Sequence, residues 1–173
     1  MSLAVRSRFD GFTAGGEDLQ RMLDAMSARS RLRVKYRQAV ESEGVNGCSF
    51  GVVTMVGSDA RIDIYDAEHA SGRWDDAKGR MAYGMTLDID QAGNITCRTL
   101  HDDEADVYAW PTDSGSWAWE ARPHGMGRPL MEAFTYRPTQ RKPFGQSRIT
   151  RAVMSITDSA VRAALGGDIS FQF

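Results

Sequence analysis

The spacing of apolar residues divides the chain into a helical beginning, a β-rich centre and a helical end. After the polar lead FDGFTAGGEDLQ, apolar side chains recur at helical spacing at Leu19, Met22, Leu23 and Met26. Glu17 and Asp18 suit the positive end of a helix dipole. A second helix is expected from about Ser27 to Glu43, with Gly44 as its stop.

From residue 48 onward the chain is rich in short β-branched and aromatic runs that are separated by turn residues. The first pair of runs, CSFGVVTMVG and ARIDIYD, is joined by GSD. The second pair, RMAYGMTLDID and NITCRTLHD, is joined by QAGN, and the third, DVYAW and SWAWEA, by PTDSG. A last run, LMEAFTY, follows Pro129. Short runs joined by such turns indicate antiparallel strands. The sequence therefore predicts a mainly antiparallel sheet with the order of a meander.

The C-terminal part predicts a loop, RPTQRKPFG, and then a capped helix. Ser147 is the expected N-cap, and apolar residues follow at steps of three or four at Ile149, Val153, Ile156, Ala160 and Ala164. Gly166 and Gly167 are expected to end this helix. The fold class is thus α+β, with residues 17–173 as a single domain and residues 1–16 as an N-terminal arm or an expression scar.

Composition excludes several classes of protein. The 173 residues carry a formal charge of −2, so the chain as a whole is not a polycation built for nucleic acid. Cys48 and Cys97 lie far apart, without the spacing of a zinc site or a disulfide framework. No apolar run reaches the ~18 residues of a membrane span, and the N-terminus lacks a signal-peptide core. We therefore expect a protein with no membrane association.

The titratable residues do not form a recognisable catalytic pattern. His69, His101 and His124 have no ligand partner at helical or adjacent spacing. His101 precedes the acidic run 102–104, which is typical of a solvated turn, and the chain has no Gly-x-Ser-x-Gly motif. We expect no catalytic residue, no metal site and no cofactor.

Two surface features remain open to a functional interpretation. Trp110, Trp117 and Trp119 either stabilise a hairpin through cross-strand aromatic pairs or form a ligand platform. In the second case the chain would be a small β-rich ligand-binding domain or enzyme that uses His101 or His124. A basic stretch without acids either contacts phosphates or a neighbouring subunit or is a solvated loop; it contains Arg137, Arg141, Lys142, Arg148 and Arg151.

The segment RPTQRKPFGQSRITRAVMSITDSAVRAAL resembles one in the portal proteins of tailed phages, of the long-tailed actinobacterial type. In that family Pro-Phe-Gly-x-Ser-x-Ile opens a helix and a Met-Ser-x-Thr-Asp-x-Ala-x-Arg run continues it. The matching residues here are Pro143, Phe144, Gly145, Ser147 and Ile149, then Met154, Ser155, Thr157, Asp158, Ala160 and Arg162.

Three further segments resemble the family in the same order: NGCSFGVV, RIDIYD and HGMGRPL. The resemblance covers most of residues 17–173. Two departures concern loop geometry: Asn46 stands where the family often has an aromatic residue, and the HGMGRPL turn is a residue shorter than usual.

The resemblance implies a structural role without catalysis. The family forms dodecameric rings at one capsid vertex, through which double-stranded DNA is packaged and ejected. This chain would be the wing-like N-terminal part of a phage or prophage portal protein, truncated at its C-terminus. Its partners would be other portal subunits and capsid protein, with the terminase and the head-tail connector bound through other regions. It would occur in the virion, and in the host cytoplasm during assembly. The basic stretch would supply subunit-interface or DNA-proximal residues.

Overall fold

The computed structural model describes residues 9–57 and 59–170 and confirms the α+β class. Its helices are α2 (Glu17–Arg29), α3 (Leu32–Asn46) and α4 (Arg151–Ser170). Its strands are β1 (Cys48–Val56), β2 (Asp59–Asp66), β3 (Ala70–Asp75), β4 (Arg80–Ile89), β5 (Ile95–His101), β6 (Ala105–Pro111), β7 (Trp117–Pro123) and β8 (Met131–Thr135).

The strands form two antiparallel sheets rather than one meander. Strands β3 to β7 are a five-stranded meander, whereas β8 pairs with β1 in a three-stranded sheet of order β2-β1-β8. Strand β3 was not expected from the sequence. Its run ASGRWD lacks the β-branched residues that mark a strand, and its place in the sheet comes from pairing with β4 through Gly72, opposite Gly84.

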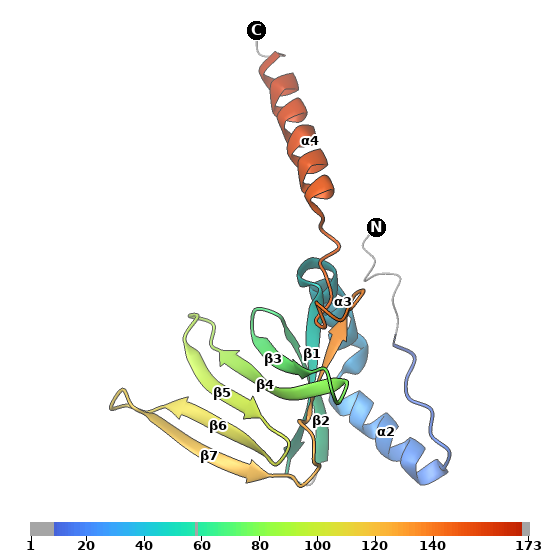
Figure 1. Ribbon diagram of the computed structural model, residues 1–173, viewed down its shortest axis with the longest axis vertical. Helices are drawn as coiled ribbons and strands as arrows, with labels where there is room; N and C mark the ends of the chain where they lie inside the picture. The colour runs from blue at the N-terminus through green and yellow to red at the C-terminus, as the bar shows by residue number, and fades with distance from the viewer. Residues whose placement is uncertain (1–8, 58, 171–173) are drawn as a thin grey trace.

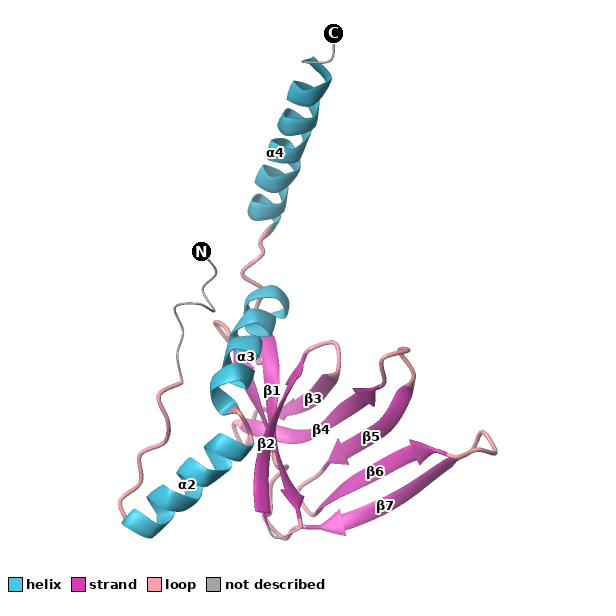
Figure 2. Cartoon of the chain, turned by 180° about the vertical axis from the view of Figure 1, so that it is seen from behind, coloured by secondary structure: helices cyan, strands magenta, loops and turns pink. Residues whose placement is uncertain are grey.

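The three-stranded sheet is the middle layer of the body. Helices α2 and α3 lie on one side of it and the five-stranded sheet on the other (Figures 1 and 2). The core between the two sheets contains Phe50 and Val52 of β1, Met81 of β4 and Met131 of β8. An antiparallel sheet that is covered on both faces explains why the alternation along β1 is incomplete.

The two N-terminal helices are those predicted, but the break between them lies a few residues later than expected, at Ser30 and Arg31. Arg31 adopts the left-handed conformation, with φ of 50°, and interrupts the helical path. The buried Ser30 accepts a hydrogen bond from the Ile62 N–H at 2.8 Å and fixes the break against β2. Helix α3 then continues past the expected stop at Gly44 and ends at Gly47, whose φ is 95°.

Helix α4 begins later and ends later than predicted. The Ser147 hydroxyl accepts a hydrogen bond from the Ile149 N–H in a turn, and Thr150 accepts one from the Val153 N–H at 3.4 Å, so Thr150 is the cap. Gly166 and Gly167 lie inside the helix, which extends to Ser170. The helix projects away from the body (Figure 1). None of the helices in the described ranges is long and apolar enough to cross a bilayer.

Candidate functional site at the junction of helix α3 and the segment before α4

Backbone hydrogen bonds join the segment 136–148 to the C-terminal end of α3, and we call this region the junction. The Tyr136 N–H donates to the Gly47 carbonyl at 3.0 Å, and the Gln146 N–H donates to the Tyr136 carbonyl at 2.9 Å. The Arg148 N–H donates to the Gly44 carbonyl, also at 2.9 Å. These bonds hold the residues up to Arg148 against the end of α3, and helix α4 begins after them, at Arg151.

Two glycines allow the backbones to approach each other at the junction. A Cβ on Gly145 would lie 2.5 Å from the Tyr136 carbonyl oxygen and 2.6 Å from that of Gly47. A Cβ on Gly47 would lie 2.8 Å from the Gln146 carbonyl carbon. Both glycines also have positive φ. Glycine is therefore favoured at these two positions by the short contact distances and by the backbone conformation.

An aromatic contact fastens the junction to the core. The Phe144 ring lies 5.7 Å from that of Phe50 and 6.4 Å from that of Trp74, with the second pair edge to face. Both are ordinary distances for stabilising aromatic pairs. The loop expected from the sequence at residues 137–145 is therefore anchored to both sheets through Phe144.

Arg148 is an internal side chain of the junction. Its guanidinium lies 3.9 Å from the centre of the Tyr136 ring and forms an ion pair with Glu43 at 3.5 Å. The Arg148 Nε is buried and has no hydrogen-bond partner. This arginine therefore holds the segment before α4 against helix α3.

The other members of the basic stretch are exposed. Arg137 stacks on the Tyr136 ring at 5.3 Å and has φ of 49°. Arg141 and Lys142 lie in a tight turn in which Thr139 and Lys142 exchange backbone hydrogen bonds, and Arg151 opens α4. The structure thus brings Arg137 and Arg148 together on one aromatic ring, and the remaining three present their charges to solvent.

The three tryptophans do not gather into one platform. In the β6 to β7 register Trp110 is opposite Ala118, whereas Trp119 is opposite Ala109. Because side chains alternate between the faces of a sheet, Trp110 lies on the other face from Trp117 and Trp119. The predicted hairpin is confirmed, but no two tryptophans are opposite each other across it, so it is not stabilised by cross-strand aromatic pairs. Trp117 stacks instead against the Arg98 guanidinium at 4.3 Å.

His101 has partners that its neighbours in sequence did not reveal. Its Nδ1 lies 2.8 Å from an Asp106 carboxylate oxygen and its Nε2 lies 3.2 Å from the Thr86 hydroxyl. All three side chains are buried, on adjacent strands of the five-stranded sheet. The order Asp, His, hydroxyl is that of a catalytic triad. With 1% of His101 and 2% of Thr86 exposed, no substrate reaches the hydroxyl, and the three residues hold the strands together.

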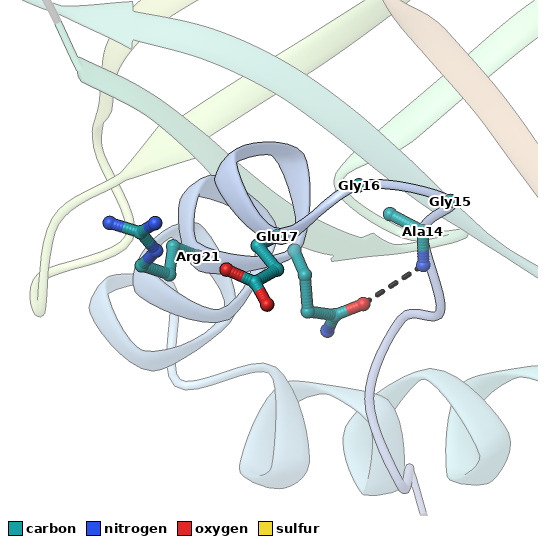
Figure 3. A pocket seen from close by; sticks show the side chains of 6 residues that line it. Ala14, Gly15, Gly16, Glu17 and Arg21 are labelled. Carbon is teal, nitrogen blue, oxygen red and sulfur yellow. Dashed lines mark hydrogen bonds between the residues drawn. The ribbon is translucent and has the colours of Figure 1, made fainter.

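The other candidate sites are simpler. His124 contacts the Asp102 carbonyl, and His69 contacts the Asp66 carboxylate at 2.6 Å. No group of three or more potential metal ligands lies within residues 9–57 and 59–170. Figure 3 shows a hollow at the start of α2, where the Ala14 N–H donates to Gln20. Glu17 lines this hollow and would repel an anion at the helix terminus.

In comparisons with known proteins, the chain matches no protein-family model and no curated protein.

Proposed function

We propose that this chain is a structural part of a phage or prophage portal protein and that it performs no catalysis. The observation that carries the proposal is the meeting of the two most specific motif segments at the junction. PFGQS and NGCSF lie about a hundred residues apart in the sequence, yet Phe144 packs on Phe50 and Gly145 on Gly47. If the residues of these two motif segments serve to pack the segments together, they are expected to lie in contact in this way.

The structure divides the basic stretch into two roles under this proposal. Arg148 positions the segment before α4, whereas the exposed Arg137, Arg141, Lys142 and Arg151 are the candidates for contact with a neighbouring subunit or with DNA. Exposed charges mainly set specificity and the rate of encounter, so each is expected to contribute modestly to assembly. Other portal subunits and capsid protein are the proposed partners, and the virion is the proposed location.

The position of α4 also supports a role in an assembly. All the side chains from Arg151 to Ala163 are exposed, and the helix projects from the body (Figure 2). Most of the stability of an amphipathic helix comes from tertiary packing of its apolar face. A helix in this position is expected to find that packing outside its own domain.

Quantitative mass spectrometry of phage particles induced from the host strain tests the proposal. Peptides from this chain should copurify with intact particles, at a small fraction of the copy number of the major capsid protein and near that of a single ring. Treatment that removes loosely bound proteins, such as a high-salt wash, should not change the ratio. Absence from washed particles, or a copy number that scales with the whole shell, would contradict the proposal.

The tryptophan platform has no observation in its favour, because Trp110 lies on the opposite face from Trp117 and Trp119. A ligand-binding or enzymatic role is therefore not proposed.

A further inference from the structure

The outer face of the five-stranded sheet, which points away from the core, is apolar. Two rows of paired residues cross it from strand to strand: Met85, Leu100, Val107 and Ala121, and next to them Leu87, Arg98, Ala109 and Trp119. Tyr83 and Trp117 extend the face along β4 and β7. Trp119 is 70% exposed, and Met85 and Leu100 are each 40% exposed.

Outside the core residues of β3 and β4, the inner face of the same sheet is largely polar. Its rows contain Thr86, Thr99, Tyr108 and Glu120, and next to them Gly84, His101, Asp106 and Arg122. An antiparallel sheet with one solvated face normally places its apolar residues inside and its polar residues outside. The apolar outer face departs from this arrangement and indicates that the outer face, as well as the inner one, is buried in the functional state of the protein.

Helix α4 carries a second apolar surface that has no cover in the described part of the chain. Val153, Ile156, Ala160 and Ala163 follow one another at steps of three or four and form a stripe along the helix, and Ile149 precedes them in the segment before it. All five are exposed, Ile156 by 70%. Arg151, Asp158 and Arg162 lie on the opposite side of the helix, so the stripe carries no charge.

These two surfaces cannot meet within one chain in this arrangement. The junction hydrogen bonds fix the start of α4 at the end of α3, and from there the helix points away from the five-stranded sheet (Figures 1 and 2). An apolar helix stripe and an apolar sheet face are the two surfaces that layered folds pack against each other.

We propose that the apolar stripe of α4 in one copy of this chain packs on the outer face of the five-stranded sheet in a second copy. The dimensions are compatible, because the helical stripe from Val153 to Ala163 is about 16 Å long and a seven-residue strand such as β6 is about 23 Å long. Charge does not oppose the contact. Arg98, the charged residue in the two rows, lies on the Trp117 ring, and the stripe brings no cation toward it.

The area favours an exchange in which each copy gives one helix and receives one. The exposed part of α4 from Arg151 to Ala163 is about 20 Å long and 10 Å wide and covers roughly 200 Å² of each partner, so that one contact buries about 400 Å² in total. Two such contacts bury about 800 Å², which is below the ~1,200 Å² of a stable interface and corresponds to weak, concentration-dependent association. This inference rests on the two surfaces alone and does not depend on the proposed portal role.

Sedimentation equilibrium of the purified chain tests the exchange. The parent chain at about 100 µM should sediment as a dimer or a larger closed assembly. The helix variant Val153→Asp/Ile156→Asp and the sheet variant Leu100→Asp should each sediment as a monomer, because each places a charge in the contact. The control Ser155→Asp/Arg162→Asp, on the polar side of α4, should associate like the parent. Circular dichroism at low micromolar concentration, where the parent dissociates, should show the same thermal transition of the body in all four proteins.

A mixture of the two monomeric variants provides the sharper test. The intact helix of the sheet variant can pack on the intact sheet of the helix variant, so mixing should restore a heterodimer, held by one contact and therefore weaker than the parent. Three results would overturn the proposal. The first is a monomeric parent, and the second is a mixture that stays monomeric. The third is continued association of either variant alone, which would indicate a sheet-to-sheet or helix-to-helix contact.

Discussion

At the scale of single residues, Arg148 shows how burial changes the meaning of a charge. In the sequence it is one of five cations with the same predicted role, contact with a neighbouring subunit or with DNA. The structure instead pairs it with Glu43 and stacks it on Tyr136. We expect Arg148→Ala to lower the free energy of unfolding by about 1–2 kcal/mol, through the lost stacking and ion pair. Urea denaturation measures this, and the exposed Arg141→Ala is the matched control, with an expected change below about 0.5 kcal/mol. Equal effects of the two substitutions would contradict the assignment.

Asp106 is the second residue for which we predict a measurable role. Asp106→Ala removes the partner of the buried His101 Nδ1 and should destabilise the fold by about 2–3 kcal/mol, because a buried donor is left without an acceptor. Asp106→Asn keeps an acceptor oxygen and should cost less. Glu104→Ala, in the exposed acidic run, should have little effect on the thermal midpoint. A large loss in the Glu104 variant with none in the Asp106 variant would reverse this assignment.

Tyr65 gives the fold a dependence on alkaline pH. Burial, and then the neighbouring Asp88 carboxylate, raises the pKa of Tyr65 well above its ordinary value of about 10. Above about pH 10, the ordinary pKa of tyrosine, the unfolded chain releases the Tyr65 proton, whereas the folded chain retains it. The free energy of unfolding therefore falls as the pH rises beyond about 10. Tyr65→Phe should make this decline shallower in denaturation curves between about pH 9 and 11, and Tyr83→Phe, at an exposed position, should not. Parallel curves for the parent and Tyr65→Phe would contradict the prediction.

The spacing of residues in the sequence argued against a metal site at His101, but it did not show the partners of this side chain. Asp106 and Thr86 meet it through the register of three strands, and register depends on turn geometry and on which face is buried. The acidic run 102–104 next to His101 was correctly interpreted as a turn between β5 and β6.

At the scale of elements, the junction depends on glycine where the chain approaches itself. Gly145→Ala should destabilise the fold by at least about 2 kcal/mol, because the new methyl group collides with two carbonyl oxygens at a left-handed position. Gly115 has nearly the same φ, 78° against 76°, and nothing within 4 Å of an added Cβ. Gly115→Ala should therefore cost only about 1 kcal/mol. Thermal denaturation compares the two, and similar midpoints would show that the contact at Gly145 is not tight.

The elements themselves were largely predictable from local patterns, but their ends and partners were not. Alternation and turn residues located β1, β2 and β4 to β8, which are fixed by short-range sequence. The segment just before the start of α4 at Arg151 is placed by the Arg148 to Gly44 hydrogen bond, which joins residues far apart in the sequence. The pairing of β8 with β1 likewise brings together strands separated by the whole five-stranded sheet in sequence, and no local pattern contains that information.

At the scale of the whole molecule, the distribution of apolar surface is the main finding. The body has a conventional core between its two sheets, yet the outer face of the five-stranded sheet and the stripe of α4 remain exposed. Exposed apolar patches of this kind mark interaction sites in folded proteins. The sequence predicted an amphipathic α4, but exposure of its stripe follows only from the direction in which the junction points the helix.

The proposed portal role is tested most directly by locating this domain on a phage particle. Gold-labelled antibodies against residues 17–135, applied to particles opened at low salt and imaged by electron microscopy, should mark a single vertex in each capsid. The marked vertex should be the one that bears the tail. Particles without label, or label spread evenly over the shell, would contradict the account.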